Sequence, residues 1–307
     1  MVVRVAKNVL ELIGQTPVVS LTNMRSRDGG EVYVKLEGFN PAGSIKDRPG
    51  LYMIEKAEEK GLLQPGSIIL EATSGNTGIG LAMAASLKGY PIVIVMPENM
   101  SEERKKILRA YGAELVLTPA AEGMPGAVKK ASSMAESDSR YYLVKQFENP
   151  ANAECHEVTT AREILQQMGK NLDALVCGVG SGGTITGIAR VLKQEIPAIK
   201  IVAVEPANSA VLSGNLAGPH KIQGIGAGFI PLVLNLELVD NIIAVTDEDA
   251  IETCHQLARQ EALLLGISSG AAIFAALQLA DKMGKGKKIL AIAPDSADKY
   301  ISTELFD

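Results

Sequence analysis

The chain has 307 residues, of which 47% are apolar and 21% are charged. This balance predicts a globular protein with a substantial core, built as one large domain or two of moderate size. The 30 basic and 35 acidic residues give a net charge of −5. Since no basic face is evident in the sequence, nucleic acid is excluded as the main partner.

The cysteines and histidines give no sign of a metal site. Cys155, Cys177 and Cys254 are far apart and odd in number, and the three histidines share no ligand spacing with them. Free thiols in a reducing cytosol are the simplest interpretation. Cys155 and His156 are neighbours whose side chains point apart on a helix or strand, so we interpret His156 as structural or exposed rather than catalytic.

The ends and the hydropathy indicate a cytoplasmic protein. Residues 1–7 lack the apolar segment and cleavage pattern of a secretory signal peptide. No uncharged apolar run approaches the ~18 residues that a membrane-spanning helix requires. We therefore expect no contact with a membrane.

Short apolar runs alternate with helical patterns along the whole chain. Such alternation predicts the α/β class, with mostly parallel sheets covered on both faces. Residues 206–235 interrupt it with a long irregular segment rich in glycine, and connections of that length are usually functional. We expect strands over 18–21, 31–36, 67–72, 92–96, 114–117, 141–144, 173–179, 200–205, 242–245 and 288–293, and helices over 79–88, 101–111, 127–135, 159–168, 185–193, 246–265 and 269–283.

A lysine stands at the start of one more predicted helix, which continues to a stop at Gly61. Ser44 is a candidate N-cap, and Asp47 would lie in the first turn, where a negative charge is favourable. Lys46 itself gains nothing from this end of the macrodipole, which should lower its pKa. A lysine with a lowered pKa is a candidate nucleophile for forming an imine, although a solvated surface lysine is the simpler interpretation.

A glycine-rich turn, Gly180-Ser181-Gly182-Gly183-Thr184, lies between a predicted buried strand and a helix. Backbone N–H groups and the helix dipole converge on an anion in this geometry, and the two hydroxyls add donors. No Walker A lysine closes the turn. The residues also match G-x-G-x-x-G from Gly178, with Glu205 as the acidic partner of a dinucleotide site, so a nucleotide-binding oxidoreductase stays an alternative.

Two further turns open helices. Ser74-Gly75-Asn76-Thr77-Gly78 offers N–H groups, two hydroxyls and an amide, which suit a carboxylate, although a well-capped helix start would look the same. Gly266-Ile267-Ser268-Ser269-Gly270 opens the last predicted helix. Taken alone, it favours an N-cap by Ser268 or Ser269.

Together these segments resemble the cysteine synthase (O-acetylserine sulfhydrylase) family, within the tryptophan-synthase-β-like, fold type II pyridoxal-phosphate enzymes. The resemblance extends from Leu12 to Thr303. It is carried by five motifs in the family's order: Asn40-Pro41-x-x-Ser44-x-Lys46-Asp47-Arg48, Thr73-Ser74-Gly75-Asn76-Thr77-Gly78, Gly180-Ser181-Gly182-Gly183-Thr184, Lys221-Ile222-Gln223-Gly224-Ile225-Gly226 and Gly266-Ile267-Ser268-Ser269-Gly270.

The resemblance implies a role for each motif. Lys46 would hold pyridoxal 5′-phosphate as an imine and act as acid and base at the substrate α-carbon. Ser268 would face the pyridine nitrogen, where a hydroxyl leaves it largely unprotonated and suits β-elimination. The other cofactor-binding residues would be Asn76, Gly180, Ser181, Gly182, Gly183 and Thr184, and the substrate-binding residues Thr73, Ser74, Gly75, Thr77, Gln146 and Gly224, with Gly224–Gly228 in a region that closes over the site.

The implied reaction is a β-replacement. O-acetyl-L-serine would lose acetate to give an α-aminoacrylate, and sulfide would add to form L-cysteine. Close alternatives on this scaffold are cystathionine β-synthase, cyanoalanine synthase and a sulfhydrylase that uses O-phosphoserine. The resemblance also implies a homodimer and a C-terminal tail of serine acetyltransferase as a possible partner, which leaves a non-catalytic binding protein as a third reading.

The resemblance predicts two open, mostly parallel α/β lobes with the cofactor in the cleft between them. Residues 37–146 would form a smaller, mobile domain, and residues 1–36 with 147–307 a larger one. Three positions depart from the family pattern: Ser181 where threonine is commoner, Lys145 where a second glutamine is expected, and Pro49 where a small or apolar residue is usual. Of these, Lys145 could alter substrate preference.

Overall fold

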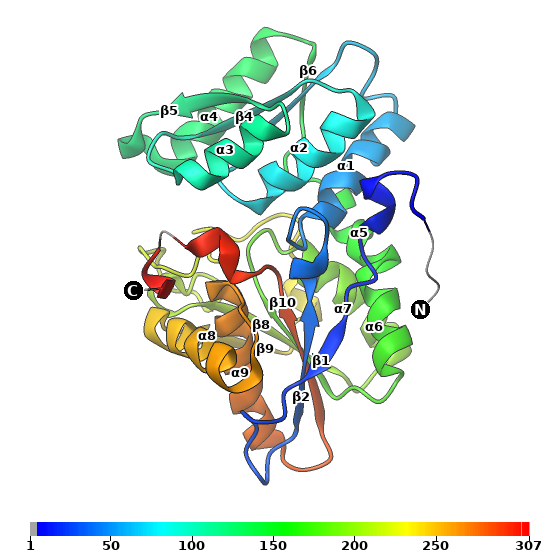
Figure 1. The fold of residues 1–307 in the computed structure, drawn as a ribbon, viewed down its shortest axis with the longest axis vertical. Helices are drawn as coiled ribbons and strands as arrows, with labels where there is room; N and C mark the ends of the chain where they lie inside the picture. Colours follow the sequence, from blue (N-terminus) through cyan, green and yellow to red (C-terminus); the bar gives the residue numbers. More distant parts are fainter. Residues whose placement is uncertain (1–4, 302, 307) are drawn as a thin grey trace. The chain divides into compact units, whose positions relative to one another are not determined.

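The computed structural model describes residues 5–301 and 303–306. The chain divides into two compact units (Figure 1). The first contains residues 5–13 and Asn40–Asn152, and the second contains Gly14–Phe39 and the described residues from Ala153 onward. These divisions fall after residues 13, 39 and 152, whereas the sequence-based expectation places them after residues 36 and 146.

The sequence-based expectation placed the N-terminal residues in the larger lobe. In the structure, residues 5–13 group with the first unit, where Leu10, in the short 3₁₀ helix Val9–Leu12, packs against the hydrophobic core. The expectation that residues 1–7 carry no signal peptide partly concerns residues 1–4. The family resemblance near the end of the chain includes residue 302. Both lie outside the described residues.

The first unit is built on a four-stranded sheet of order β5-β4-β3-β6, in which every pairing is parallel. All six residues of β4 are buried, as expected for a strand covered on both faces. Neighbouring residues alternate between the two cores: Ile69 packs with α1 and α2, and Leu70 with α4. The elements are β3 (Ile68–Ala72), β4 (Ile92–Pro97), β5 (Glu114–Thr118), β6 (Tyr141–Leu143), α1 (Asp47–Glu59), α2 (Asn76–Lys88), α3 (Glu102–Ala110) and α4 (Gly123–Ser137).

The second unit contains a six-stranded sheet of order β1-β2-β10-β7-β8-β9, parallel except for the antiparallel edge pair β1 and β2. Figure 1 shows β2 and β10 side by side, although they come from opposite ends of the chain. The strands are β1 (Val18–Ser20), β2 (Glu31–Leu36), β7 (Ala174–Gly178), β8 (Lys200–Pro206), β9 (Asn241–Val245) and β10 (Lys288–Ala293).

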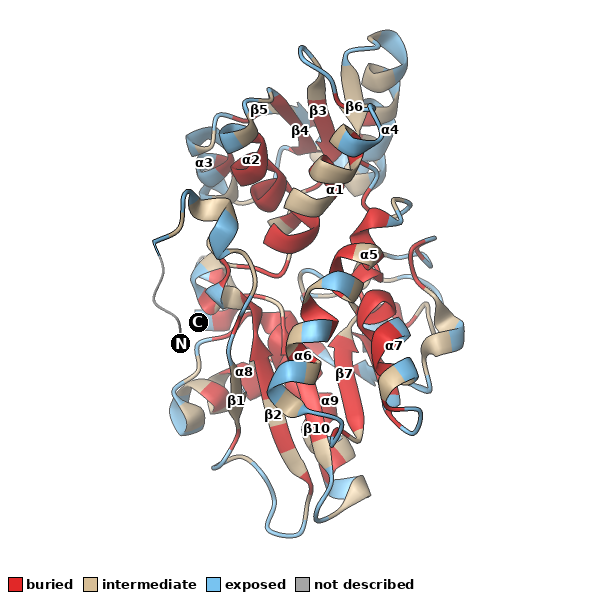
Figure 2. Ribbon diagram, turned by 90° about the vertical axis from the view of Figure 1, so that its right-hand side faces the viewer, coloured by how far each residue is buried: buried red, intermediate tan, exposed pale blue. Residues whose placement is uncertain are grey.

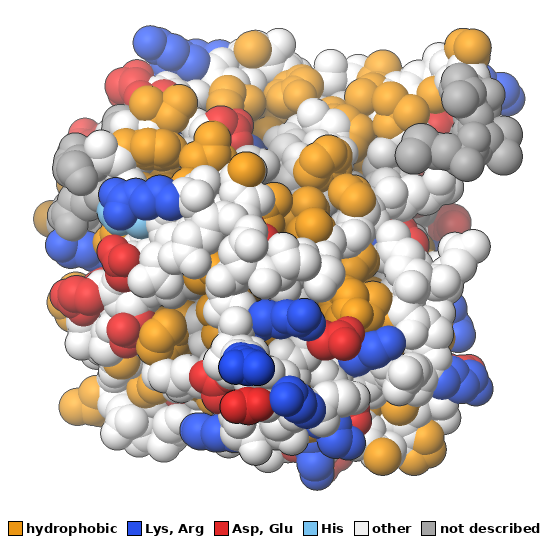
Figure 3. Space-filling view, turned by 60° about the horizontal axis from the view of Figure 1, so that its bottom comes forward, with side chains coloured by type: hydrophobic (Ala, Val, Ile, Leu, Met, Phe, Trp, Pro, Cys, Tyr) orange, Lys and Arg blue, Asp and Glu red, His pale blue; other side chains and the backbone are white. Residues whose placement is uncertain are grey.

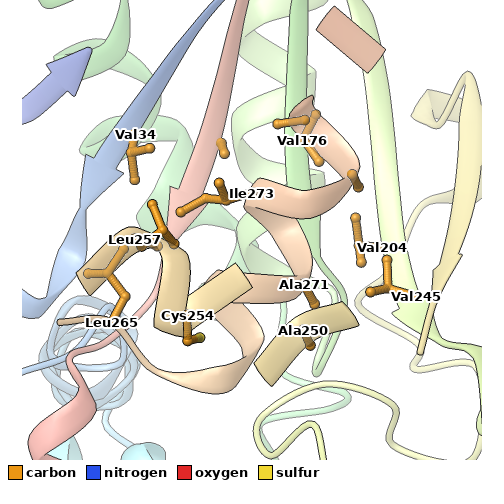
Figure 4. Packing of buried hydrophobic residues seen from close by; sticks show 14 of the residues in the cluster. Val34, Val176, Val204, Val245, Ala250, Cys254, Leu257, Leu265, Ala271 and Ile273 are labelled. Atoms are coloured by element: carbon orange, nitrogen blue, oxygen red, sulfur yellow. The ribbon is translucent and has the colours of Figure 1, made fainter. Parts of the chain in front are cut away.

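Helices cover this sheet, and its largest core lies under α8 and α9. In Figure 4, Val34, Val176 and Val204 of the strands lie in one cluster with Leu257 of α8 and Ile273 of α9. Figure 2 shows the same burial as red central strands with exposed residues on the outer helices. The helices are α5 (Ala151–Val158), α6 (Thr160–Met168), α7 (Gly183–Glu195), α8 (Asp247–Glu261) and α9 (Ile267–Met283).

The α/β class and the parallel strands are confirmed, and most expected elements lie within a few residues of their predicted bounds. Helix α5 is a difference, because no helix is predicted over residues 151–158. The side chain of Asn149 accepts a hydrogen bond from the N–H of Ala151 and so supports the first turn of this helix. Helix α8 ends four residues early because Ala262 adopts a left-handed conformation with φ of 56°.

Charged side chains of both signs lie on the surface, and the cysteines lie inside. Figure 3 shows basic and acidic side chains interspersed over the face in view rather than gathered by sign. Among the described residues, no helix is both long and apolar enough to span a bilayer, and no group of three potential ligands could hold a metal ion. All three cysteines are buried free thiols.

Candidate functional site

Lys46 immediately precedes α1 and occupies its N-cap position. Ser44 is therefore not the cap that the sequence suggested. Its hydroxyl instead accepts a hydrogen bond from the N–H of Lys46 at 3.2 Å, which orders the turn before the helix. Asp47 opens the helix as expected, and its carboxylate accepts a hydrogen bond from the N–H of Ala42 at 2.6 Å. Hydrogen bonds to the side chains of Ser44 and Asp47 thus fix the turn that carries Lys46.

Two glycines bring Lys46 close to α2. A Cβ added at Gly80 would lie 2.5 Å from the carbonyl oxygen of Lys46, and one added at Gly50 would lie 2.7 Å from the backbone of Gly80. The two helix backbones therefore touch at a point where no larger side chain fits. This contact joins the start of α1 to α2, which begins at the predicted carboxylate turn.

The turn before α2 follows directly from β3. Its helix begins at Asn76, three residues earlier than predicted, with Gly75 in an extended conformation at the N-cap. The hydroxyl of Thr73 accepts a hydrogen bond from the N–H of Gly75 at 3.2 Å. The carbonyl of Ser74 accepts one from the guanidinium of Arg104 in α3 at 3.1 Å, a contact that the sequence did not reveal.

Gln146 lies far along the chain from this turn but joins it in the first unit. Its side-chain oxygen accepts a hydrogen bond from the hydroxyl of Thr77 at 2.7 Å, and both side chains are buried. The parallel pairing of β6 with β3 explains the encounter, because both strands end at the same edge of the sheet. Of the predicted substrate-binding residues, Thr73, Ser74, Gly75, Thr77 and Gln146 are therefore held in one unit with Lys46 and Asn76.

Lys145 directs its charge away from this network. Its side chain is 54% exposed, and its ammonium pairs with Glu148 at 3.4 Å. The backbone of Lys145 has a left-handed φ of 57°. The departure from the family pattern thus places a cation on the surface, which removes the physical reason for expecting an effect on substrate preference.

The predicted anion loop lies in the second unit, between β7 and α7. Gly182, with φ of 81°, occupies the N-cap position, and Gly183 is the first residue of the helix. A Cβ at Gly180 would lie 2.4 Å from the carbonyl oxygen of Gly224, and one at Gly182 would lie 2.6 Å from Leu234. These two glycines leave a closely packed cradle of backbone at the positive end of a 13-residue helix, with the hydroxyl of Ser181 buried beside it.

Ser268 lies near the same cradle, since a Cβ added at Gly224 would lie 3.7 Å from its hydroxyl oxygen. The interpretation of Ser268 or Ser269 as an N-cap is wrong, because Gly266 occupies that position and no side chain caps α9. The hydroxyl of Ser269 donates to the carbonyl of Asp295 at 3.3 Å. Gly180, Gly224 and Ser268 therefore meet although the chain separates them widely.

His156 is a site residue that the sequence did not reveal. It is fully buried, with Nδ1 at 2.9 Å from the hydroxyl of Thr160 and Nε2 at 3.3 Å from that of Thr184. Gly187 permits this approach, because a Cβ there would lie 2.1 Å from the carbonyl oxygen of Ala153 in α5. The sequence-based interpretation left His156 as structural or exposed; the side chain is buried, and one of its two hydroxyl partners belongs to the anion loop.

Glu205 does not have the geometry of a dinucleotide-binding residue. It is only 1% exposed, and its carboxylate accepts hydrogen bonds from the N–H groups of Leu212 and Ser213 at 2.7 and 3.1 Å. The hydroxyl of Ser213 donates a third bond to it. The carboxylate thus anchors the irregular segment after β8 and is not presented to a ribose.

Known proteins identify the family. The pyridoxal-phosphate dependent enzyme family model matches residues 9–295. The chain belongs to this family. It is 54% identical to a cysteine synthase of Staphylococcus aureus over 300 residues, covering 97% of this chain and 96% of that protein.

Solved structures agree with this assignment. A cysteine synthase of Entamoeba histolytica has a TM-score of 0.96 and 44% identity, covering 99% of this chain and 91% of the other. An O-acetylserine dependent cystathionine β-synthase of Helicobacter pylori has a TM-score of 0.94 and 42% identity, covering 99% and 100%. The family and the fold predicted from the five motifs are confirmed.

Proposed function

We propose that this chain is a pyridoxal-phosphate dependent cysteine synthase, which converts O-acetyl-L-serine and sulfide into L-cysteine and acetate. The observation that carries the proposal is the contact of Gly50 and Gly80, which joins the helix start at Lys46 to the helix that begins in the Thr73–Thr77 turn. The strong identity to a cysteine synthase supports the same reaction.

The residues of the anion loop fit the phosphate of the cofactor. A Cβ at Gly180 would collide with the carbonyl oxygen of Gly224, and one at Gly182 with Leu234, so only glycine fits at these two positions of the loop. The backbone N–H groups at the start of α7 and the positive end of its dipole favour an anion there. We propose that Gly180, Ser181, Gly182, Gly183 and Thr184 hold the phosphate, and that Asn76 donates to the 3-oxygen of the ring. When bound, the cofactor supplies an electron sink for charge that develops at the substrate α-carbon.

The proposed roles of the remaining residues follow from their chemistry. Lys46, one residue before α1, binds the cofactor covalently and then moves the proton at the substrate α-carbon. Ser268 faces the ring nitrogen with a neutral hydroxyl, so it adds no negative charge that would favour protonation there. The hydrogen-bonding groups of Thr73, Ser74, Gly75, Thr77 and Gln146 orient the substrate carboxylate.

The irregular segment after β8 contributes Gly224 to substrate binding. Gly224, Gly226 and Gly228 all have positive φ, between 68° and 96°. Such backbone conformations favour glycine and suit a segment that changes shape. We propose that residues 224–228 close over the bound substrate, and that the first unit moves during the cycle.

The assembly and the setting are further parts of the proposal. The family resemblance supports a homodimer, a cytoplasmic location and the C-terminal tail of serine acetyltransferase as a partner. Three buried free cysteines are consistent with a reducing compartment. Size-exclusion chromatography with light scattering tests the dimer, and binding of a tail peptide tests the partner.

The decisive experiment follows the absorbance of the protein loaded with cofactor. We expect a visible band near ~410 nm, a change on adding O-acetylserine, and its reversal with release of cysteine on adding sulfide. The Lys46→Ala protein should lose the band. A higher kcat/KM with O-phosphoserine than with O-acetylserine would refute the proposed substrate, and reduction of a nicotinamide nucleotide instead of cysteine formation would refute the reaction class.

A further inference from the structure

Glu71 is a buried carboxylate one residue before the end of β3, immediately upstream of the Thr73–Thr77 turn. Among the residues that the structure describes, no buried cation pairs with it, and the ammonium of the nearby Lys145 turns outward to Glu148. Its partners lie instead in the segment after β6. The N–H of Lys145 donates to one carboxylate oxygen at 2.9 Å, and the side-chain amide of Gln146 approaches the other at 3.3 Å.

The carboxylate of Glu71 accepts a backbone hydrogen bond just beyond the last pairing of β3 with β6. Val144 still donates to the carbonyl of Leu70 at 3.0 Å, as in a regular parallel pair. At Lys145 the chain turns into the left-handed region, which costs a non-glycine residue on the order of 1–3 kcal/mol. Because of this turn, the N–H of Lys145 donates to the carboxylate of Glu71 and not to a strand carbonyl. The side chain of Asn152 donates to the carbonyl of Gln146 at 2.8 Å. Side-chain hydrogen bonds thus hold the strained turn at the N–H of Lys145 and at the carbonyl of Gln146.

The same carboxylate determines which way the amide of Gln146 points. An ionised carboxylate only accepts hydrogen bonds, so it must face the amide nitrogen. The amide oxygen is then the end that accepts from the hydroxyl of Thr77 at 2.7 Å. The amide nitrogen has a second hydrogen, which remains as a donor for an anionic ligand.

We propose that Glu71 is a positioning residue that orients the Gln146 amide and the Thr77 hydroxyl for recognition of the substrate carboxylate. This inference rests on the proposed function. It gives Glu71 no contact with substrate, and it explains why a negative charge is tolerated beside a site for another carboxylate: Glu71 is already satisfied by N–H donors. Loss of the charge would free the amide to rotate and present its oxygen to the ligand.

Burial supports a functional dependence on pH. It raises the pKa of Glu71 to about 7, and the negative charge of Glu148 adds to the increase, while the N–H donors of Lys145 and Gln146 oppose it. Tyr142 of β6 is the other titratable group that interacts with this carboxylate, and the residue paired with Glu71 on β4 is the apolar Ile94. Glu71 therefore changes protonation near neutral pH, since no cation in the described part of the chain lowers its pKa.

The test compares Glu71→Gln with the wild type in the cofactor-loaded protein. L-serine and L-serinamide differ at the carboxylate, and both are titrated through the absorbance of the bound cofactor. The wild type should bind L-serine more tightly than L-serinamide. In Glu71→Gln, the ratio of the Kd for serinamide to the Kd for serine should be about tenfold smaller. Cofactor affinity should stay within about twofold. An unchanged ratio in a folded, loaded variant would overturn the inference.

Three further variants make the result specific. Glu148→Gln removes an exposed carboxylate from the same segment and should keep the wild-type ratio. If Glu71→Gln does not fold, the double variant Glu71→Gln with Lys145→Gly replaces it, because glycine relieves the positive φ at position 145. The Kd ratio of the double variant is then compared with that of Lys145→Gly alone. The wild-type ratio should fall as pH decreases below about 7, while the ratio of the variant should not. A wild-type protein that shows no response to L-serine would contradict the proposed function itself.

Discussion

At Glu71 and His156, single side chains act on the proposed site without belonging to a recognisable motif. Glu71 supports the Gln146 amide, and His156 supports the hydroxyl of Thr184. Both are fully enclosed by protein. We therefore expect both side chains to act by orienting other groups. Substitutions that preserve side-chain volume distinguish this effect from a loss of packing.

Ionisation of Glu71 should cost stability as the pH rises. Its pKa is about 7 in the folded protein and about 4.5 in the unfolded chain. Folding therefore favours the protonated form, and this contribution is lost as pH rises from 4.5 through 7. Relative to the wild type, Glu71→Gln should gain on the order of 2–3 kcal/mol in free energy of unfolding between about pH 5 and about pH 8. Urea denaturation at both pH values checks this, and a constant difference would contradict it.

Loss of the contact between His156 and Thr184 should weaken cofactor binding. Asparagine can keep the interaction of Nδ1 with Thr160 but cannot reach Thr184. One hydrogen bond contributes about 1 kcal/mol, so His156→Asn should raise the Kd for pyridoxal phosphate about fivefold to tenfold. The measurement is an absorbance titration of the cofactor-free protein. Thr160→Val removes only the other partner and should stay within about twofold; an equal effect would mean that His156 acts through packing alone.

Among the elements, the pair α1 and α2 does most to assemble the first unit's residues. The N-terminus of each helix contributes candidates, Lys46 from one and Asn76 from the other. Gly50 and Gly80 set the distance between them. In the second unit, Gly187 does the same for α5 and α7 and brings His156 to the anion loop.

Gly80→Ala should separate α1 from α2. Alanine is favoured over glycine in a helix by about 1 kcal/mol, so without a clash the variant would be more stable. The new Cβ would lie 2.5 Å from the carbonyl oxygen of Lys46. We therefore expect a net loss of about 1–3 kcal/mol in free energy of unfolding and a lower kcat/KM. Ser86→Ala, on the exposed side of α2, is the matched control and should not reduce either quantity.

At the scale of the whole molecule, each unit has its own sheet and its own hydrophobic core. The residues that we propose for the cofactor are distributed over both units: Lys46 and Asn76 in the first, residues 180–184 and Ser268 in the second. Cofactor binding should therefore affect the stability of the entire chain rather than that of one unit.

Removal of the cofactor should lower the Tm. A ligand at about 1,000 times its Kd adds about 4 kcal/mol, which for a chain of this length corresponds to a shift on the order of 5–10 °C. Differential scanning calorimetry of the loaded and cofactor-free proteins measures the shift. If the units unfold in two transitions, both should move. A shift confined to one transition, or a full shift in Lys46→Ala, would contradict the assignment of the residues.

Much of the fold could be predicted because its signals are local. The buried run at 92–96 is apolar throughout, and the glycines after the helices at 61, 89 and 112 have positive φ. The caps were less predictable. Ser44 and Ser268 both have the chemistry of an N-cap, but Lys46 and Gly266 occupy the cap positions. A good capping side chain shows only that a turn is near, since neighbouring residues compete for the same N–H groups.

The order of five short motifs determined the family, because each motif depends on residue types at fixed spacing and needs no knowledge of distant contacts. Only the tertiary structure decided which residues support them. Glu71 meets Gln146 because two parallel strands end at one edge of a sheet, and His156 meets Thr184 because Gly187 lets two helices touch. Such partners lie 75 and 28 residues apart, and no local pattern in a single sequence records which distant side chain folding will bring to a given hydrogen bond.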